Sequence, residues 1–230
     1  MDHLTVAFVL FPNVTQLDLT GPVQVLSRLG NAKIELVAHS LEPVPTDAGF
    51  SIMPTTTFEE CVSPDIVCVP GGEEADDAME DKAILSWIRT ANISADWTTS
   101  VCTGSLVLGA AGLLKGKRAT CHWASLSFLE HFGAIPAQQR VVFDGRIVTG
   151  GGVTAGIDFA LQLVAAIHGE DHAKLIQLSL EYDPAPPFQN GSPVTAEPSV
   201  LRAFHELTEV NQTRREKRVK AAAMMQTGRY

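Results

Sequence analysis

The chain has 230 residues, of which 45% are hydrophobic and 19% charged, a composition typical of globular proteins that excludes a disordered or fibrous chain. Its formal net charge of −9 argues against non-specific nucleic-acid binding, which requires a basic surface to neutralise phosphates. Apolar runs are too short to cross a bilayer, and residues 6–11 lack the length and the preceding basic residues of a signal peptide. We therefore expect a soluble protein with no nucleic-acid or membrane partner.

Four cysteines are present, and none of them belongs to a CxxC pair or has the spacing of zinc ligands: Cys61, Cys68, Cys102 and Cys121. In a chain of this length such a set indicates reduced thiols rather than a disulfide framework, so we expect a cytoplasmic protein. No clustered His, Asp and Glu pattern suggests a metal site.

The first half of the chain alternates apolar runs with helical patterns. The apolar runs predict buried strands at residues 6–11, 34–38, 65–69 and 98–101. Helices are predicted at residues 17–29, ended by Gly30, and at residues 76–90, which begin with acidic residues as the helix dipole favours. Residues 43–57 are rich in Pro, Thr and Gly and predict a loop or hairpin insert.

The second half of the chain continues the alternation. Cys102 ends the fourth strand and starts a helix of small residues, after which a strand at 118–121 and a helix at 124–132 are predicted. Asp144-Gly145 predicts the turn of a hairpin over residues 141–149. A long helix from about residue 154, a proline-rich crossing at 184–198 and a C-terminal helix from about 199 follow. We expect one α/β domain over residues 1–230, with a mostly parallel sheet covered by helices on both faces.

Polar or flexible residues follow the ends of several predicted strands, and ligands of open α/β sheets bind at that edge. They are the Asp18 segment, Gly71-Gly72, Cys102-Thr103 and residues 150–152. Cys102 lies at a strand-to-helix turn, where unpaired helix N–H groups can lower the pKa of a thiol and make it a nucleophile. The alternative is a buried, inert cysteine, and the convergence of these segments on one edge favours the nucleophile.

The partner of Cys102 is open between two residues. Asp18 lies between Leu17 and Leu19, so its carboxyl either satisfies a helix start or faces an apolar site where its pKa rises and it can donate a proton. His122 could activate the thiol instead, although its strand-to-helix junction favours a packed or capping histidine.

The small residues around Cys102 also have two readings. Gly72 belongs to a tight turn and can present a backbone N–H to developing negative charge. Thr103 either caps the following helix or hydrogen-bonds the reacting group.

Nucleotide binding has little support in the sequence. Gly116-Lys117 lacks the upstream glycine of a P-loop, and residues 150–156 lack the dinucleotide fingerprint. The basic residues within 214–220 could form a nucleic-acid arm, but a solvated last helix is the favoured interpretation.

The motifs together resemble the DJ-1/PfpI superfamily and, within it, the isocyanide hydratases, over most of the chain. The resemblance rests on Phe11-Pro12, Gln16-Leu17-Asp18-Leu19-Thr20-Gly21-Pro22, Val69-Pro70-Gly71-Gly72, Val101-Cys102-Thr103-Gly104-Ser105, Ala119-Thr120-Cys121-His122-Trp123, and the segments 150–158 and 181–188. It implies a flavodoxin-like three-layer sandwich of the class I glutamine-amidotransferase type, a homodimer and no cofactor.

The same resemblance implies a set of site residues. Cys102 would be the nucleophile, with Asp18 beside it where many members of the superfamily have Glu. Thr103 and the backbone of Gly72 would complete the turn around the nucleophile. Gly151 and Val153 would lie where the following helix packs near the nucleophile, and Tyr182 would reach the same region.

Other groups of the superfamily fit less well. Protease-like and glyoxalase-like members place His directly after the nucleophile, where this chain has Thr103. Regulators of the AraC type share Cys-Thr-Gly and His-Trp, but the residues after 198 have room for about one helix, so we expect no DNA-binding domain. The alternative to an enzyme is a redox sensor or binding module that uses a low-pKa Cys102.

The implied activity is the conversion of a small apolar isocyanide and water to an N-substituted formamide. Cys102 would form a covalent thioimidate while Asp18 delivers and accepts protons, in a largely apolar pocket and without a catalytic histidine. A second hypothesis is that modification of Cys102 loosens the helix that begins near Thr154.

Overall fold

A seven-stranded sheet forms the centre of the molecule in the computed structural model, which describes residues 3–226. Its strands are, in spatial order, β10 (Val141–Asp144), β11 (Ile147–Gly150), β7 (Trp97–Val101), β6 (Ile66–Val69), β1 (Leu4–Val9), β2 (Ala32–Ala38) and β5 (Thr56–Thr57). Only β10 runs antiparallel to its neighbour. All residues of β6 and β11 are buried, as expected of apolar parallel strands that are covered on both faces.

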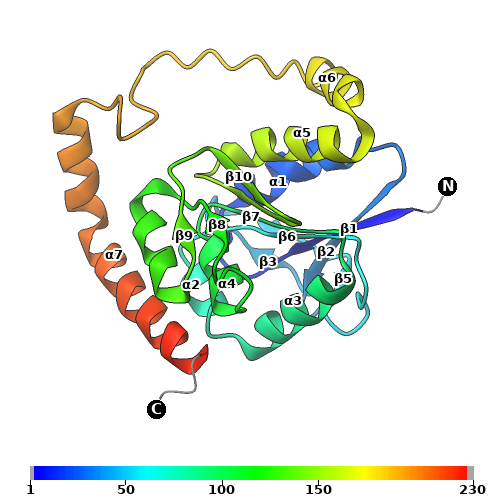
Figure 1. The fold of residues 1–230 in the computed structure, drawn as a ribbon, viewed down its shortest axis with the longest axis horizontal. Coiled ribbons are helices and arrows are strands. Elements are labelled where there is room, and N and C mark those ends of the chain that lie inside the picture. Colours follow the sequence, from blue (N-terminus) through cyan, green and yellow to red (C-terminus); the bar gives the residue numbers. More distant parts are fainter. Residues whose placement is uncertain (1–2, 227–230) are drawn as a thin grey trace.

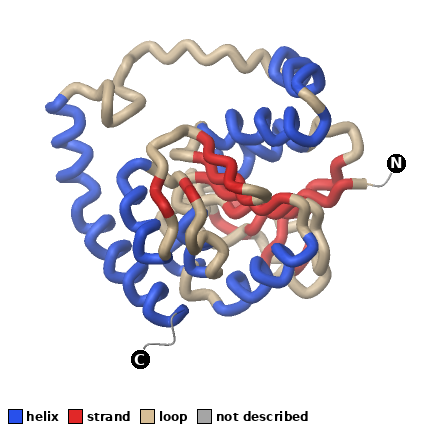
Figure 2. The backbone as a smooth tube through the Cα atoms, viewed as in Figure 1, coloured by secondary structure: helices blue, strands red, loops and turns tan. Residues whose placement is uncertain are grey.

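Helices cover both faces of this sheet. They are α1 (Gln16–Leu26), α2 (Ala75–Ala78), α3 (Lys82–Ser94), α4 (Gly104–Ala110), the 3-10 helix η1 (Trp123–Phe132), α5 (Ala155–His168), α6 (Glu170–Ser179) and α7 (Pro198–Gln226). Figure 1 shows α1, α5 and α6 on one side of the sheet and α2, α3 and α4 on the other, with α7 along the outside. Figure 2 shows the long crossing that leads from α6 to α7. The predicted α/β sandwich with a mostly parallel sheet is confirmed.

Three predicted elements differ from the structure. The helix expected at 76–90 is two helices, because the Asp81 side chain accepts hydrogen bonds from the N–H groups of Ala83 and Ile84 and starts α3 anew. The long helix from residue 154 stops at Gly169, whose φ of 88° ends α5 before α6 begins. The strand expected at 118–121 is only a two-residue strand outside the main sheet.

Two short strand pairs complete the fold. They are β3 (Val44–Pro45) with β4 (Ser51–Ile52), within the expected hairpin insert, and β8 (Arg118–Ala119) with β9 (Ile135–Pro136).

Small residues bring α1 and α5 close together. A Cβ atom added to Gly156 would lie 3.0 Å from Pro22 Cδ, and one added to Gly21 would lie 3.3 Å from Ile157 Cγ1. The first turn of α1 carries Asp18, and α5 begins directly after Val153 and Thr154. The close packing therefore fixes the Asp18 helix relative to the segment that precedes α5.

The register of the central strands aligns their carboxyl ends. Val69 of β6 pairs with Ser100 of β7, and Val101 of β7 pairs with Gly150 of β11. The segments that follow these three strands therefore leave the sheet at one edge, as the sequence predicted.

The single domain predicted for residues 1–230 remains a prediction, and residues 1–2 and 227–230 of it lie outside the described residues. Among helices of the described chain, none combines the length and apolar character needed to cross a bilayer.

Gly104 is the point at which α4 approaches β6, so Gly104→Ala should destabilise the fold. An added Cβ would overlap the Val69 carbonyl oxygen and lie 2.8 Å from the Pro70 carbonyl oxygen, both of which are backbone atoms. We expect a loss of about 3 kcal/mol in the free energy of unfolding, measured by urea titration. Gly191→Ala, where nothing lies within 4 Å, is the matched control and should be neutral. Equal stability of the two variants would contradict this account.

Candidate active site

Cys102 lies in a strained turn between β7 and α4. Its φ of 56° is in the left-handed region, which a residue with a side chain rarely adopts. Its backbone N–H donates to the carbonyl oxygens of Gly150, at 3.2 Å, and Gly151, at 2.8 Å. The turn has the strand–turn–helix form that exposes a nucleophile above a sheet, although Cys102 as a whole is only 6% exposed.

The surroundings of the thiol act in opposite directions on its pKa. Burial and the negative charge of Asp18 raise the pKa of Cys102 above its usual value, whereas hydrogen bonds from the backbone N–H groups of Val153 and Thr103 lower it. Burial is the largest of these effects. The expectation of a lowered thiol pKa is therefore wrong, because burial outweighs the hydrogen bonds from the two backbone N–H groups.

The Asp18 carboxyl is fully buried next to this thiol. Burial raises the pKa of Asp18 to about 7, partly opposed by a hydrogen bond from the Gly71 N–H and by the interaction with Cys102, while Asp47 raises it further. Oδ2 accepts the Gly71 N–H at 2.9 Å. Oδ1 has no regular hydrogen bond in the described part of the chain, which leaves it free to take a proton from the thiol. The carboxyl can therefore exchange a proton near neutral pH.

Thr103 and Gly72 hold each other rather than a ligand. The Thr103 hydroxyl accepts the Gly72 N–H at 3.0 Å and donates to the Gly72 carbonyl oxygen at 3.0 Å. The Thr103 side chain does not cap α4, and the Gly72 N–H is already engaged, so the predicted use of that N–H to stabilise a reacting group is wrong. The backbone N–H groups at the thiol belong instead to Thr103 and Val153.

Gly71, and not Gly72, is the glycine that contacts Asp18, and the sequence did not distinguish between the two. Its N–H is the donor to Asp18, and a Cβ at this position would lie 2.6 Å from the Thr103 backbone nitrogen and 2.8 Å from Asp18 Oδ2. Only glycine fits between these two residues. The Gly-Gly pair indicated a close approach, but not which of the two peptides faces the carboxyl.

Two of the three remaining candidate residues contact Cys102, and the third does not. Gly151 and Val153 both contact Cys102 through their backbones, as described above. Tyr182 does not join them: its hydroxyl donates to the Asp158 carboxylate of α5 at 3.2 Å, and its ring lines a hollow of about 310 Å³ between α1 and α5. The prediction that Tyr182 reaches the nucleophile is therefore not supported by its contacts.

His122 is held by contacts at the start of η1 and with α7. Its Nδ1 accepts the Ala124 N–H at 3.3 Å at the start of η1, and its ring stacks on Phe204 of α7. Burial lowers the pKa of His122, so the ring is neutral at physiological pH. Asp18, and not His122, interacts directly with the thiol.

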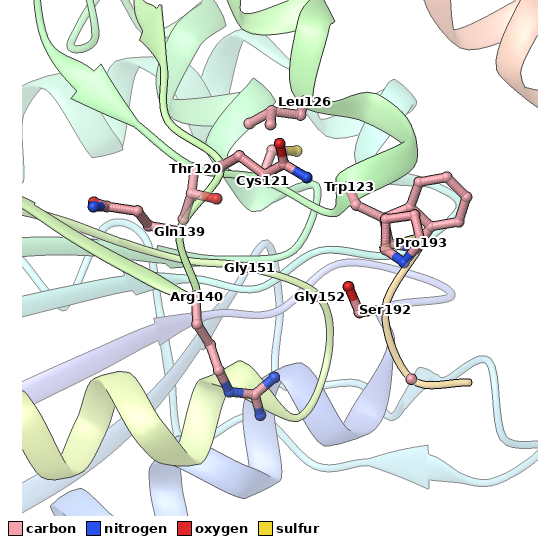
Figure 3. A pocket seen from close by; sticks show the side chains of 12 residues that line it. Thr120, Cys121, Trp123, Leu126, Gln139, Arg140, Gly151, Gly152, Ser192 and Pro193 are labelled. Atoms are coloured by element: carbon pink, nitrogen blue, oxygen red, sulfur yellow. The ribbon is translucent and has the colours of Figure 1, made fainter. Parts of the chain in front are cut away.

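A pocket of about 250 Å³ lies against the Gly151-Gly152 segment. Figure 3 shows Cys121, Trp123 and Leu126 on one side of it and Ser192 and Pro193 of the crossing on another, with Gln139 and Arg140 at the rim. Cys102 and Asp18 do not line this pocket. Within residues 3–226 no three His, Cys, Asp or Glu side chains gather closely enough to hold a metal ion.

The chain is similar in sequence and in fold to several known proteins. The model of the DJ-1/PfpI family matches residues 4–166. The isonitrile hydratase of Pseudomonas putida is 55% identical over 198 residues, which cover 86% of this chain and 87% of that protein. The HTH-type transcriptional regulator CdhR of Pseudomonas aeruginosa is 30% identical over 76% of this chain and 53% of that protein. The crystal structure of a ThiJ/PfpI family protein from Pseudomonas syringae has a TM-score of 0.91 and 43% identity, over 97% of this chain and 91% of that one.

Asp18→Asn should make the protein more stable at alkaline pH. Because the folded-state pKa of about 7 exceeds the ordinary value of 3.8, the folded protein loses stability as pH rises from about 4 to 7 and Asp18 ionises in its buried site. The neutral amide avoids this cost, which is on the order of 3 kcal/mol at pH 8. Urea unfolding at pH 5 and pH 8 measures it. A wild-type protein that is as stable as the variant at pH 8 would show that Asp18 ionises without penalty.

Proposed function

The chain belongs to the DJ-1/PfpI family, and from this we propose that it is an isocyanide hydratase, which adds water to an isocyanide and releases an N-substituted formamide. The 55% identity to an isonitrile hydratase, over 198 residues, supports the reaction. The observation that carries the proposal is the buried Asp18 carboxyl, with a pKa of about 7, beside the Cys102 thiol. The pair holds both the nucleophile and the proton that this addition requires.

The first step forms a covalent thioimidate. The Cys102 sulfur attacks the terminal isocyanide carbon while its proton passes to Asp18, and the carboxyl then delivers that proton to the same carbon. The bond formed is C–S, and the triple bond becomes a C=N double bond. The N–H groups of Thr103 and Val153 stabilise the negative charge that builds on sulfur during the proton transfer.

The second step releases the formamide. Asp18, again a carboxylate, takes a proton from water as the water oxygen adds to the thioimidate carbon, and it passes that proton to the nitrogen. Collapse of this intermediate forms the C=O bond and breaks the C–S bond, and the hydroxyl proton goes by way of Asp18 to the departing sulfur, which restores the thiol. Because the only co-reactant is water and all protons move between water, Asp18, Cys102 and the substrate, the reaction needs no cofactor.

Hydration of this kind suits a site without a histidine at the thiol. Peptide cleavage requires protonation of a departing amine, for which thiol proteases use an adjacent histidine. Thr103 follows the nucleophile here, and His122 is engaged at the start of η1. The isocyanide has no leaving group, so one carboxyl can serve both steps.

The alternative function, a redox sensor or binding module, fits the geometry less well. Sensor thiols have a low pKa and are open to solvent, because the thiolate reacts with the oxidant. The pKa of Cys102 is raised, and the residue is almost fully buried.

We also propose that the protein is a cytoplasmic homodimer. The four free cysteines support a reducing compartment. Large exposed apolar side chains on α6, the crossing and α7 offer a surface for a second copy; they include Leu175, Leu178, Phe188, Val194, Leu207 and Val210. Light scattering on the purified chain should give twice the mass of one chain, and a single-chain mass at micromolar concentration would refute the dimer.

Turnover of an aryl isocyanide should depend on both members of the pair. Formation of the formamide, followed by chromatography, should fall by about 10³-fold or more in Cys102→Ala, because the covalent step is lost. Asp18→Asn should lose about 10²-fold or more, because the amide cannot carry the proton. Cys61→Ala, which removes a buried thiol outside this site, is the matched control and should retain activity. Full activity of Cys102→Ala would refute the mechanism, and reversible oxidation of Cys102 without any turnover in the wild type would favour the redox sensor.

A further inference from the structure

The C-terminal helix α7 crosses the acidic segment that follows Gly71-Gly72 and pairs with it through three arginines. Arg214 bonds Glu73 at 3.1 Å, Arg215 bonds Asp76 at 2.6 Å, and Arg218 bonds Glu80 at 2.8 and 2.9 Å. The basic residues within 214–220 therefore serve the fold. The interpretation of this stretch as a solvated helix face is wrong for Arg215, which is 7% exposed.

Arg215 differs from its two neighbours because it reaches the backbone of the active-site loop. Nε donates to Asp76 Oδ1, while Nη2 donates to the carbonyl oxygens of Gly72, at 3.3 Å, and Glu73, at 3.1 Å. Both charged side chains of the pair are buried, and buried ions are tolerated only when hydrogen bonds satisfy them. The planar guanidinium supplies donors in the fixed fork that this arrangement requires.

The loop that Arg215 holds is the one that serves Asp18. The Gly72 carbonyl receives Arg215 from one side and the Thr103 hydroxyl from the other. The preceding peptide contributes the Gly71 N–H to Asp18 Oδ2. A shift of Gly72 would therefore move the Gly71 N–H, which is the backbone donor that the described residues offer to the Asp18 carboxylate.

We propose that Arg215 is a positioning residue for the active site, which fixes the Gly71 N–H against Asp18 by holding the carbonyls of Gly72 and Glu73. The kinetic consequence rests on the proposed hydratase function, whereas the structural one does not. Arg215 lies outside residues 4–166, which the family model matches. The C-terminal helix thus supplies part of the site that the family domain does not contain.

Arg215→Lys tests the proposal, because lysine keeps the charge beside Asp76 but cannot also hold both carbonyls. Arg218→Lys is the matched control, because Arg218 lies on the same helix as Arg215 but forms its ion pairs with Asp77 and Glu80 at the surface. The first readout is the pH dependence of Cys102 alkylation by iodoacetamide, followed by peptide mass spectrometry, which requires no isocyanide. The charged or titratable side chains that act on the pair are Asp47, Cys68 and Cys121, and both lysine variants retain them.

In Arg215→Lys we expect the midpoint of the pH profile of Cys102 alkylation to move to higher pH by about one unit. This is the size of the pKa change expected when the Asp18 carboxylate loses a charge-assisted hydrogen bond. Arg218→Lys should match the wild type. For isocyanide hydration, kcat should fall about tenfold in Arg215→Lys with KM little changed, because the substrate does not touch Arg215. Failure of the wild type to hydrate isocyanides would refute the proposed function and leave the alkylation shift as the test of Arg215.

An unchanged alkylation profile in Arg215→Lys would overturn the proposal, as would an equal shift in Arg218→Lys, which would indicate general anchoring by α7. Arg215→Gln, which keeps an amide donor but no charge, is the second variant if the lysine variant does not fold. It should show the same shift when compared with Arg218→Gln, and a wild-type profile would again overturn the proposal.

Discussion

Burial of the Asp18 carboxyl is the constraint on which the chemistry of this site depends. In water the group would be a carboxylate at neutral pH, indifferent to a thiol that ionises several units higher. Within the described residues the carboxyl is hydrogen-bonded by the Gly71 N–H and interacts with the Cys102 thiol, and the loss of water brings its pKa to about 7. Acid and base forms are then both populated, so one group can take a proton in one step and return it in the next.

This arrangement concentrates several energetically unfavourable features at one edge of the sheet. Cys102 has a left-handed backbone, Val153 has a φ of 20°, and Asp18 ionises without full solvation. The rest of the molecule offsets these costs. Parallel strands that are buried on both faces and the close contact of Gly156 with Pro22 form a rigid frame, so the local strain persists in the folded state.

The convergence of Asp18, Cys102 and the glycine segments followed from the sequence, because parallel strands end at a common edge. The raised pKa of Cys102 did not, since it results from burial of the thiol and from the charge of Asp18, and both depend on how distant segments of the chain pack. Whether Gly71 or Gly72 donates its N–H to Asp18 depends on the orientation of one peptide group. Residue types and spacing do not specify that orientation.

Contacts between residues that are far apart in the sequence were the hardest to predict. Arg215 and Asp76 are 139 residues apart, and nothing in the local pattern of either indicates the other. Charge complementarity was the available signal, since three arginines of one helix face four acids of residues 73–80. Tyr182 was placed near the nucleophile from the family resemblance alone, whereas its hydroxyl hydrogen-bonds Asp158.

The shallow exposure of Cys102 also determines which molecules can react with it. Only 6% of the residue is exposed, and the backbone N–H groups of Val153 and Thr103 point at its sulfur. Small electrophiles, such as a terminal isocyanide carbon or iodoacetamide, therefore reach the sulfur more readily than a bulky disulfide does. Burial thus selects the reaction partners of the thiol by their size.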